Sequence, residues 1–245
     1  MNSLSHLYGK GVFTTVAVVG GGLFLWEKHW RRLLDNAGRS GIALCEGAEK
    51  DVLRRIGAEL ERQGVIDGRV RVSVCDESQS SIWPGSGGGT EITVIAAVRR
   101  DIPKDLAVTM SPYIVNSCSP LAGIKSCNYL EKIMTLDAAR RGGFDECVCI
   151  NERGHVTSAA MANIFWRVGG HYFTPGLQTG CLSGTTREHI LESLACDEAE
   201  ADASVLGKAD AIYLTSAGIG VRSVRVFGGV TYDMSEAEIC RILPF

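Results

Sequence analysis

The chain has 245 residues, enough to bury a sizeable core in one or two domains. Its net charge of -3 does not predict a polyanion-binding surface, so no nucleic-acid partner is expected. The apolar stretch 11–26 is interrupted by Thr14, Thr15 and a run of glycines and predicts no membrane helix or signal peptide. The nine cysteines show no metal-ligand spacing, so we expect no metal and predict free thiols in a reducing cytosol.

The first part of the chain predicts strands and two helices. Strands are expected at residues 11–19, 23–26, 70–74, 92–98 and 106–110, and helices at 27–34 and 46–63. Residues 78–90 are rich in Ser and Gly and predict a mobile loop. A phosphate-binding loop is the disfavoured alternative there, because the stretch leads into a strand and lacks the Lys-Ser/Thr pair.

The second part predicts an alternation of helices and strands. Helices are expected at residues 129–141, 185–196 and 235–243, and strands at 146–151, 155–157, 163–168, 211–215 and 221–226, with a tight turn at Arg153-Gly154. Strand runs interleaved with helices indicate an α+β chain of two domains. We expect a small α/β domain at 1–112, a linker at 113–123 and a larger domain at 124–245.

Lys125 is the first candidate for chemistry. Its neighbours are Ile124, Ser126 and Cys127, so a segment that enters the core would desolvate the amine. Desolvation would lower the pKa of Lys125 toward ~7–8, where an amine acts as a nucleophile and a base. The alternative is an ordinary lysine that extends to water.

Three further features suggest an anion site. Gly184, Thr185 and Thr186 open a predicted helix, whose first N–H groups and dipole attract a phosphate, although a simple helix cap has the same pattern. The turn at 215–218, with Ser216 and Ala217, is a second candidate nest of N–H groups. Arg32 would add positive charge, or lie on a solvated helix face. With Lys125, these features suggest a phosphorylated carbonyl cofactor, held at one end and condensed at the other.

In this order, the motifs resemble the class IV aminotransferase family, which includes branched-chain and D-amino acid aminotransferases and aminodeoxychorismate lyase. The matching segments are residues 9–15, 29–33, 121–125, 182–187 and 214–224. The resemblance implies a two-domain enzyme of fold type IV, a homodimer, and pyridoxal phosphate bound in a cleft between the domains. It also implies a cytoplasmic enzyme that acts on a small amino compound.

The resemblance assigns roles to single residues. Lys125 falls on the lysine that forms the Schiff base, and Leu182 falls on the residue that packs on the cofactor ring. Tyr129 is expected near the ring hydroxyl. The remaining cofactor-binding positions are Arg32, Ser158, Gly184, Thr185, Thr186, Ser216 and Ala217, and the substrate-facing positions are Phe13, Thr14 and Thr15. Phe-Thr-Thr and Leu-Ala-Gly-Ile-Lys are similar to the lyase branch, so a lyase is favoured over an aminotransferase or a cofactor binder with little catalysis.

Two positions depart from the family pattern. Ser158 stands where the family has a glutamate that faces the pyridine nitrogen, and a neutral hydroxyl cannot hold that nitrogen protonated. A cofactor ring whose nitrogen is not held protonated withdraws electrons less strongly, which favours elimination over transamination. The family also has about one further hairpin before the Gly-x-Gly motif, and Lys10 replaces its usual aspartate, so we expect that the N-terminal hairpin is missing.

Overall fold

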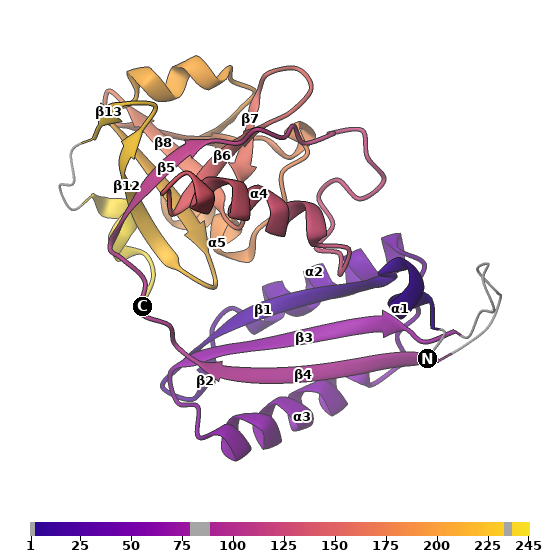
Figure 1. Cartoon of the computed structure of the whole chain (residues 1–245). Coiled ribbons are helices and arrows are strands. Elements are labelled where there is room, and N and C mark those ends of the chain that lie inside the picture. The colour runs from indigo at the N-terminus through magenta and orange to yellow at the C-terminus, as the bar shows by residue number, and fades with distance from the viewer. Residues whose placement is uncertain (1–2, 79–88, 233–236) are drawn as a thin grey trace. The chain divides into compact units, whose positions relative to one another are not determined.

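The computed structural model describes residues 3–78, 89–232 and 237–245. The chain divides into two compact units (Figure 1). Unit 1 comprises Met1–Asp101 and Ile124–Tyr129, and unit 2 comprises Ile102–Gly123 and Leu130–Phe245. Lys125 thus groups with unit 1. The domain boundaries given above stay a prediction.

Unit 1 is built on a four-stranded antiparallel sheet. Its order is β2-β1-β3-β4, with β1 at Gly11–Val19, β2 at Gly22–Leu23, β3 at Gly68–Asp76 and β4 at Thr90–Val98. The helices are α1 at Leu4–Tyr8, α2 at Trp26–Arg39 and α3 at Ala48–Gln63. The strands and helices predicted here are confirmed, with three differences. Residues 23–26 give only the end of β2 before Trp26 begins α2, α2 continues to Arg39 beyond the predicted end at residue 34, and α1 was not predicted.

Strand alternation gives this sheet two different faces. Val70, Val72 and Val74 of β3 are fully buried and pack in one core with α2 and α3 residues such as Leu33 and Ile56. Successive side chains of a strand point to opposite faces, so the residues between these valines lie on the other face. The face away from the helices therefore carries polar side chains, including Arg69 and Arg71.

The backbone around Lys125 pairs with strand β1 of this sheet. Phe13 N donates to Lys125 O at 2.9 Å, Cys127 N donates to Gly11 O at 2.7 Å, and Ser126 forms an antiparallel bridge with Val12. On the helix side, Asn36 Oδ1 accepts from Lys125 N at 2.8 Å. Hydrogen bonds on both sides therefore hold the backbone of Lys125 in an extended conformation.

Unit 2 contains a nine-stranded sheet in the order β10-β9-β8-β11-β12-β5-β6-β7, with β13 paired to β12. The strands are β5 Asp105–Met110, β6 Glu146–Ile150, β7 Val156–Ala159, β8 Asn163–Val168, β9 His171–Pro175, β10 Cys196–Ala199, β11 Ala211–Ser216, β12 Gly220–Phe227 and β13 Val230–Thr231. The helices are α4 Leu130–Arg141 and α5 Thr185–Ser193, with short 3-10 turns at Leu177–Thr179, Ala203–Lys208 and Glu238–Arg241. Its core is formed by apolar residues from both halves of the sheet, such as Val148, Ile164, Ile212 and Leu214.

Two predictions in unit 2 need correction, and part of one prediction in unit 1 lies outside the described residues. The helix expected at 185–196 ends at Ser193, because Leu194 takes an extended conformation and Cys196 begins β10 parallel to β9. The C-terminal helix is only a 3-10 turn, Glu238–Arg241, and its predicted start at Ser235 is not described. Residues 79–88 of the predicted mobile loop are not described either.

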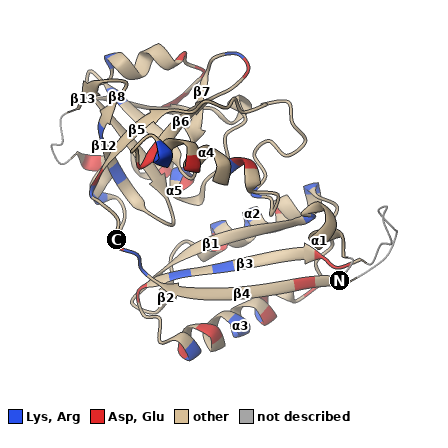
Figure 2. Ribbon diagram, in the orientation of Figure 1, with Lys and Arg blue, Asp and Glu red and all other residues tan. Residues whose placement is uncertain are grey.

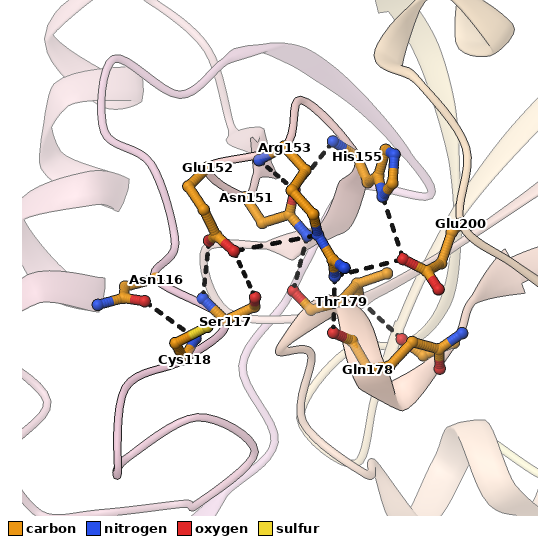
Figure 3. A network of polar contacts seen from close by, with 11 residues as sticks. Asn116, Ser117, Cys118, Asn151, Glu152, Arg153, His155, Gln178, Thr179 and Glu200 are labelled. Atoms are coloured by element: carbon orange, nitrogen blue, oxygen red, sulfur yellow. Dashed lines mark hydrogen bonds and ion pairs between the residues drawn. The ribbon is translucent and has the colours of Figure 1, made fainter.

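A polar network explains why the predicted linker groups with unit 2 (Figure 3). The Glu152 carboxylate accepts hydrogen bonds from Ser117 N at 2.9 Å and Ser117 Oγ at 2.6 Å. These bonds lower the pKa of Glu152 to about 2. Arg153 donates to Gln178 O at 3.1 Å and lies 3.3 Å from the Glu200 carboxylate. The turn between β6 and β7 therefore ties the linker to the rest of this unit.

Candidate functional site

Lys125 lies between two aromatic rings of unit 1. Its Nζ is 4.6 Å from the ring centroid of Phe13 and 5.0 Å from that of Tyr129. Nζ also donates to Tyr129 Oη at 3.3 Å. The two rings meet edge to face with their centroids 5.1 Å apart. Two aromatic faces and a hydroxyl thus orient this partly buried amine.

Arg71 joins this group, although we did not predict it as a site residue. Its guanidinium carbon lies 3.5 Å from the centroid of the Phe13 ring, and its Nε donates to Ser73 Oγ at 3.1 Å. Figure 2 shows the basic residues along β3. Alternation of Arg with buried Val in β3 was the signal that would have placed Arg71 on the face that carries Phe13. Two cations thus contact one aromatic ring, which is an arrangement suited to a carboxylate ligand.

Arg32 is positioned by Thr14. Arg32 Nη2 donates to Thr14 Oγ1 at 2.9 Å, and the same oxygen lies 2.7 Å from His29 Nδ1. A guanidinium can only donate, so the Thr14 hydroxyl accepts from Arg32 and its own proton points to His29. Thr14 is fully buried, at 0% exposure. Thr14 therefore contacts Arg32 on the face of the sheet that packs against the helices. Its neighbours Phe13 and Thr15 point to the opposite face.

His29 is the neutral member of this chain of hydrogen bonds. Burial lowers the pKa of His29 well below its ordinary value, and the positive charges of Arg32 and Lys125 lower it further. A neutral imidazole with Nδ1 as acceptor fits the proton of Thr14. The His-x-x-Arg spacing thus has a physical reason: on α2 it places a buried acceptor one turn before the guanidinium that Thr14 holds.

In unit 2, the start of α5 brings Gly184, Thr185 and Thr186 together. Thr185 and Thr186 are buried, and Gly184 caps the helix without a side-chain hydrogen bond. A Cβ on Gly184 would overlap Asn163 Oδ1, while Asn163 Nδ2 donates to Leu182 O at 2.9 Å. The backbone at this helix start therefore approaches the Asn163 side chain of β8 closely, and a larger residue at 184 would require that side chain to move. First-turn N–H groups and the helix dipole favour an anion here.

The turn after β11 supplies a second polar group in unit 2. Ser216 Oγ accepts from Gly218 N at 3.2 Å and from Ile219 N at 3.3 Å, so this hydroxyl holds the turn that contains Ala217. Thr215 Oγ1 is buried and has no hydrogen-bond partner among the described residues. A buried polar atom without a partner is rare and points to a ligand or an ordered water. The sequence placed Thr215 in the candidate turn 215–218 but named only Ser216 and Ala217 as binding residues.

Ser158 lies on β7 and is 7% exposed. Its Oγ is 3.5 Å from Thr157 Oγ1, so its immediate neighbour is another neutral hydroxyl. Glu146 is a carboxylate on the adjoining strand β6, and it accepts from the backbone N–H groups of Cys147, Ala160 and Met161. Burial raises the pKa of Glu146 against the effect of these hydrogen bonds. Glu146 thus fixes the hairpin that carries Ser158.

Each unit, taken by itself, carries groups of the kind that bind a phosphorylated aldehyde. Unit 1 offers a reactive amine at Lys125 and a positioned guanidinium at Arg32. Unit 2 offers the helix start at Gly184, close to Asn163, and the hydroxyl of Thr215, which has no hydrogen-bond partner among the described residues. Within the described part of the chain, no group of three or more His, Cys, Asp and Glu residues is placed to hold a metal ion, and no helix is long and apolar enough to cross a membrane.

A model of the amino-transferase class IV family matches residues 11–227. The aminodeoxychorismate lyase of Bacillus subtilis is 29% identical over 196 residues, which cover 76% of this chain and 65% of that protein. The chain thus spans less than two thirds of the length of this relative. The branched-chain-amino-acid aminotransferase of Escherichia coli K12 is 27% identical over 249 residues, covering 93% of this chain and 80% of the relative.

Solved structures agree on the fold. The branched-chain amino acid aminotransferase of Escherichia coli superposes with a TM-score of 0.89 at 18% identity, over 98% of this chain and 85% of that one. The 4-amino-4-deoxychorismate lyase of Pseudomonas aeruginosa gives a TM-score of 0.85 at 21% identity, over 96% and 90%. These likenesses confirm the predicted α+β fold of type IV, and at such identities they show the fold alone.

Proposed function

Because the chain belongs to the class IV aminotransferase family, whose members use pyridoxal phosphate, we propose that it is a pyridoxal-phosphate-dependent lyase. The substrate we propose is aminodeoxychorismate, which would be split into pyruvate and 4-aminobenzoate, a step of folate synthesis. A homodimer and a cytoplasmic location belong to the same proposal. The relative from Bacillus subtilis that carries the lyase name supports the choice of substrate.

The observation that carries this choice is Ser158. A family glutamate at this position would keep the ring nitrogen protonated, whereas the hydroxyl of Ser158 is neutral and lies beside the hydroxyl of Thr157. Glu146 is bonded to three backbone N–H groups and holds the hairpin in place. A weaker electron sink suits an elimination, in which the leaving group accepts the electrons as the α-proton departs.

The cofactor, when bound, supplies an aldehyde for condensation with an amine and a ring that withdraws electrons. Lys125 Nζ holds the cofactor and, once released, removes the proton from the substrate α-carbon. Tyr129 Oη and the ring of Phe13 keep this amine in place. Lys125 then returns a proton to the three-carbon fragment as the ring fragment becomes aromatic. One lysine thus serves as nucleophile and as base.

Cofactor phosphate binding is assigned to Arg32 of unit 1 and to Gly184, Thr185 and Thr186 of unit 2. Thr215, Ser216 and Ala217 are assigned to the same group. Arg32 contributes charge, and Thr14 and His29 position it. The start of α5 contributes N–H groups and dipole, and Thr215 contributes a buried hydroxyl without a partner among the described residues. Leu182 is assigned to the cofactor ring.

Substrate contacts are assigned to Phe13, Thr15 and Arg71. Aminodeoxychorismate carries carboxylates, and the guanidinium of Arg71 lies beside the Phe13 ring that also contacts Lys125. A guanidinium binds a carboxylate through two parallel hydrogen bonds. Arg71 would thus orient the substrate relative to the reactive amine.

The experiment that tests this function is product analysis without a 2-oxo acid acceptor. Protein with pyridoxal phosphate is incubated with aminodeoxychorismate, and pyruvate and 4-aminobenzoate are quantified. Equal amounts of the two products over many turnovers support the lyase. A protein that needs a 2-oxo acid for turnover contradicts it.

A branched-chain or D-amino acid aminotransferase is the second candidate, favoured by the branched-chain relative that covers 93% of this chain. Conversion of the bound cofactor to its amine form by an amino acid would select it. A cofactor binder with little catalysis is the third candidate, and for it no amino substrate would turn over although Lys125 would still bind the cofactor.

A further inference from the structure

Two cysteines of unit 1 place their sulfur atoms over Gly11. Cys75 is the register partner of Gly11 on β3, and Cys127 N donates to Gly11 O on the other side of β1 at 2.7 Å. A Cβ built on Gly11 would lie 3.0 Å from Cys75 Sγ and 3.1 Å from Cys127 Sγ. The absent side chain of Gly11 thus leaves the space in which the two thiols meet.

The two neighbouring thiols differ in their pKa values. The Cys75 thiol beside it lowers the pKa of Cys127 to about 7, with help from Arg71 and against the effect of burial. The same interaction raises the pKa of Cys75, so Cys75 keeps its proton. Cys127 is partly exposed. Near neutral pH Cys127 is thus a partly exposed residue with a thiolate that the Cys75 thiol and Arg71 stabilise.

Arg71 connects Cys127 to the side chains around Lys125. Its guanidinium carbon lies 3.5 Å from the ring centroid of Phe13, and Lys125 Nζ lies 4.6 Å from the same centroid. Lys125 and Cys127 are two residues apart in an extended segment, so their side chains leave on the same side. An atom added to the Cys127 sulfur therefore lies on the face that carries Lys125 and Phe13.

We propose that Cys127 is an oxidation site, at which hydrogen peroxide converts the thiolate into a sulfenic acid. The sulfur attacks one peroxide oxygen, so a sulfur–oxygen bond forms while the oxygen–oxygen bond breaks. The sulfur loses two electrons, the peroxide gains them, and the departing hydroxide takes up a proton and leaves as water. Oxidation would add a polar oxygen beside Arg71 and Lys125.

A disulfide between Cys75 and Cys127 is not the expected product. The two residues lie on strands separated by β1, so their Cα atoms are about two strand spacings, or ~9.6 Å, apart. A disulfide needs Cα atoms roughly 4.4–6.8 Å apart. The oxidation therefore stops at the sulfenic acid unless the backbone moves.

Cys147 and Cys149 form an internal control within β6. Coupling between them raises the pKa of Cys147 and lowers that of Cys149, as in the first pair. Their exposures are only 0% and 1%, so neither peroxide nor an alkylating reagent reaches them in the folded protein. Reactivity thus requires both the thiolate and access, which Cys127 combines.

The test is site-resolved mass spectrometry on the native wild-type protein. Iodoacetamide labelling is timed from pH 5.5 to 9.5, and the midpoint of the Cys127 rate is expected near pH 7. At pH 7 about half of Cys127 is thiolate, against roughly 3% for an ordinary cysteine of pKa 8.5. Lower nucleophilicity offsets part of this gain, so the rate advantage is only about threefold and the midpoint is the sharper readout.

Hydrogen peroxide followed by dimedone then identifies the product. A dimedone adduct on Cys127, with Cys147 and Cys149 unmodified, supports the site. The Cys75→Ala variant should move the Cys127 midpoint upward, whereas Cys118→Ala, a change at an exposed cysteine of unit 2, should not. A wild-type midpoint of 8.5 or higher, or a Cys75–Cys127 disulfide as the main product, overturns the proposal even if no variant folds.

Discussion

Arg32 donates a 2.9 Å hydrogen bond to the hydroxyl of Thr14, a residue with no exposed surface. This bond joins α2 to β1 on the side of the sheet that the helices cover. It gives Thr14 a role that differs from that of its neighbour Thr15. The family pattern Phe-Thr-Thr thus combines a ring on one face of β1 with an arginine support on the other.

Thr14→Val should weaken the binding of pyridoxal phosphate by about tenfold, because a hydrogen bond to a charged group contributes roughly 1.5 kcal/mol. Thr15→Val is the matched control, since it removes the same atom from the opposite face of β1. Dissociation constants from absorbance titration decide the matter. Equal affinities in the two variants would show that Thr14 does not position Arg32 for the cofactor.

The stability of the protein should depend on His29 at mildly acid pH. The pKa of His29 is lowered in the folded state, so the unfolded chain takes up a proton first as pH falls. The stabilisation from neutral His29 is complete above ~6.5, the unfolded pKa, and is lost as pH falls toward the folded pKa. Melting temperatures of the cofactor-free protein between pH 7.5 and 5 should fall more steeply for wild type than for His29→Asn. Parallel curves would contradict this role.

Gly184→Ala should destabilise unit 2, because the new methyl group overlaps Asn163 Oδ1. Overpacking of this kind costs about 1–3 kcal/mol, which lowers the melting temperature by several degrees. Gly207→Ala is the control, because a Cβ there meets no atom within 4 Å. Adding Asn163→Ala to Gly184→Ala should recover part of the loss. A Gly184→Ala variant that matches Gly207→Ala would refute the close approach of α5 to Asn163.

Ser158→Glu should restore a strong electron sink if Ser158 faces the ring nitrogen. We expect a shifted cofactor spectrum and an increase of about tenfold in transamination, which corresponds to ~1.4 kcal/mol of barrier. Ser158→Ala, which stays neutral, should leave the ratio of transamination to pyruvate release unchanged. If Ser158→Glu changes neither the spectrum nor the ratio, the argument from the ring nitrogen is wrong.

The sequence predicted most of the fold because hydrophobic periodicity marks strands such as β3 and helices such as α3 directly. It did not predict β9 and β10. β10 has little apolar character, and its pairing with β9 joins residues distant along the chain. The predicted helix at 185–196 was too long for the same reason, because the chain pairs with β9 from Cys196 onward.

The candidate site was predictable where a motif has a local cause. Gly184 and the His-x-x-Arg spacing are examples, since each reflects geometry within one element and its nearest strand. Arg71 was missed, and Thr215 was predicted only as part of the turn 215–218. Arg71 becomes notable only when Phe13 of the neighbouring strand is placed beside it, and Thr215 only when its hydroxyl is found buried without a partner among the described residues.

The measurement that tests the central claim most directly is the visible absorption spectrum of the purified protein with pyridoxal phosphate, for wild type and Lys125→Ala, while pyruvate is followed after addition of aminodeoxychorismate. The proposed function predicts a visible band that requires Lys125 and pyruvate that appears only with wild type and without a 2-oxo acid. A wild-type protein with no such band, or a Lys125→Ala variant with the same band and the same pyruvate release, would contradict it.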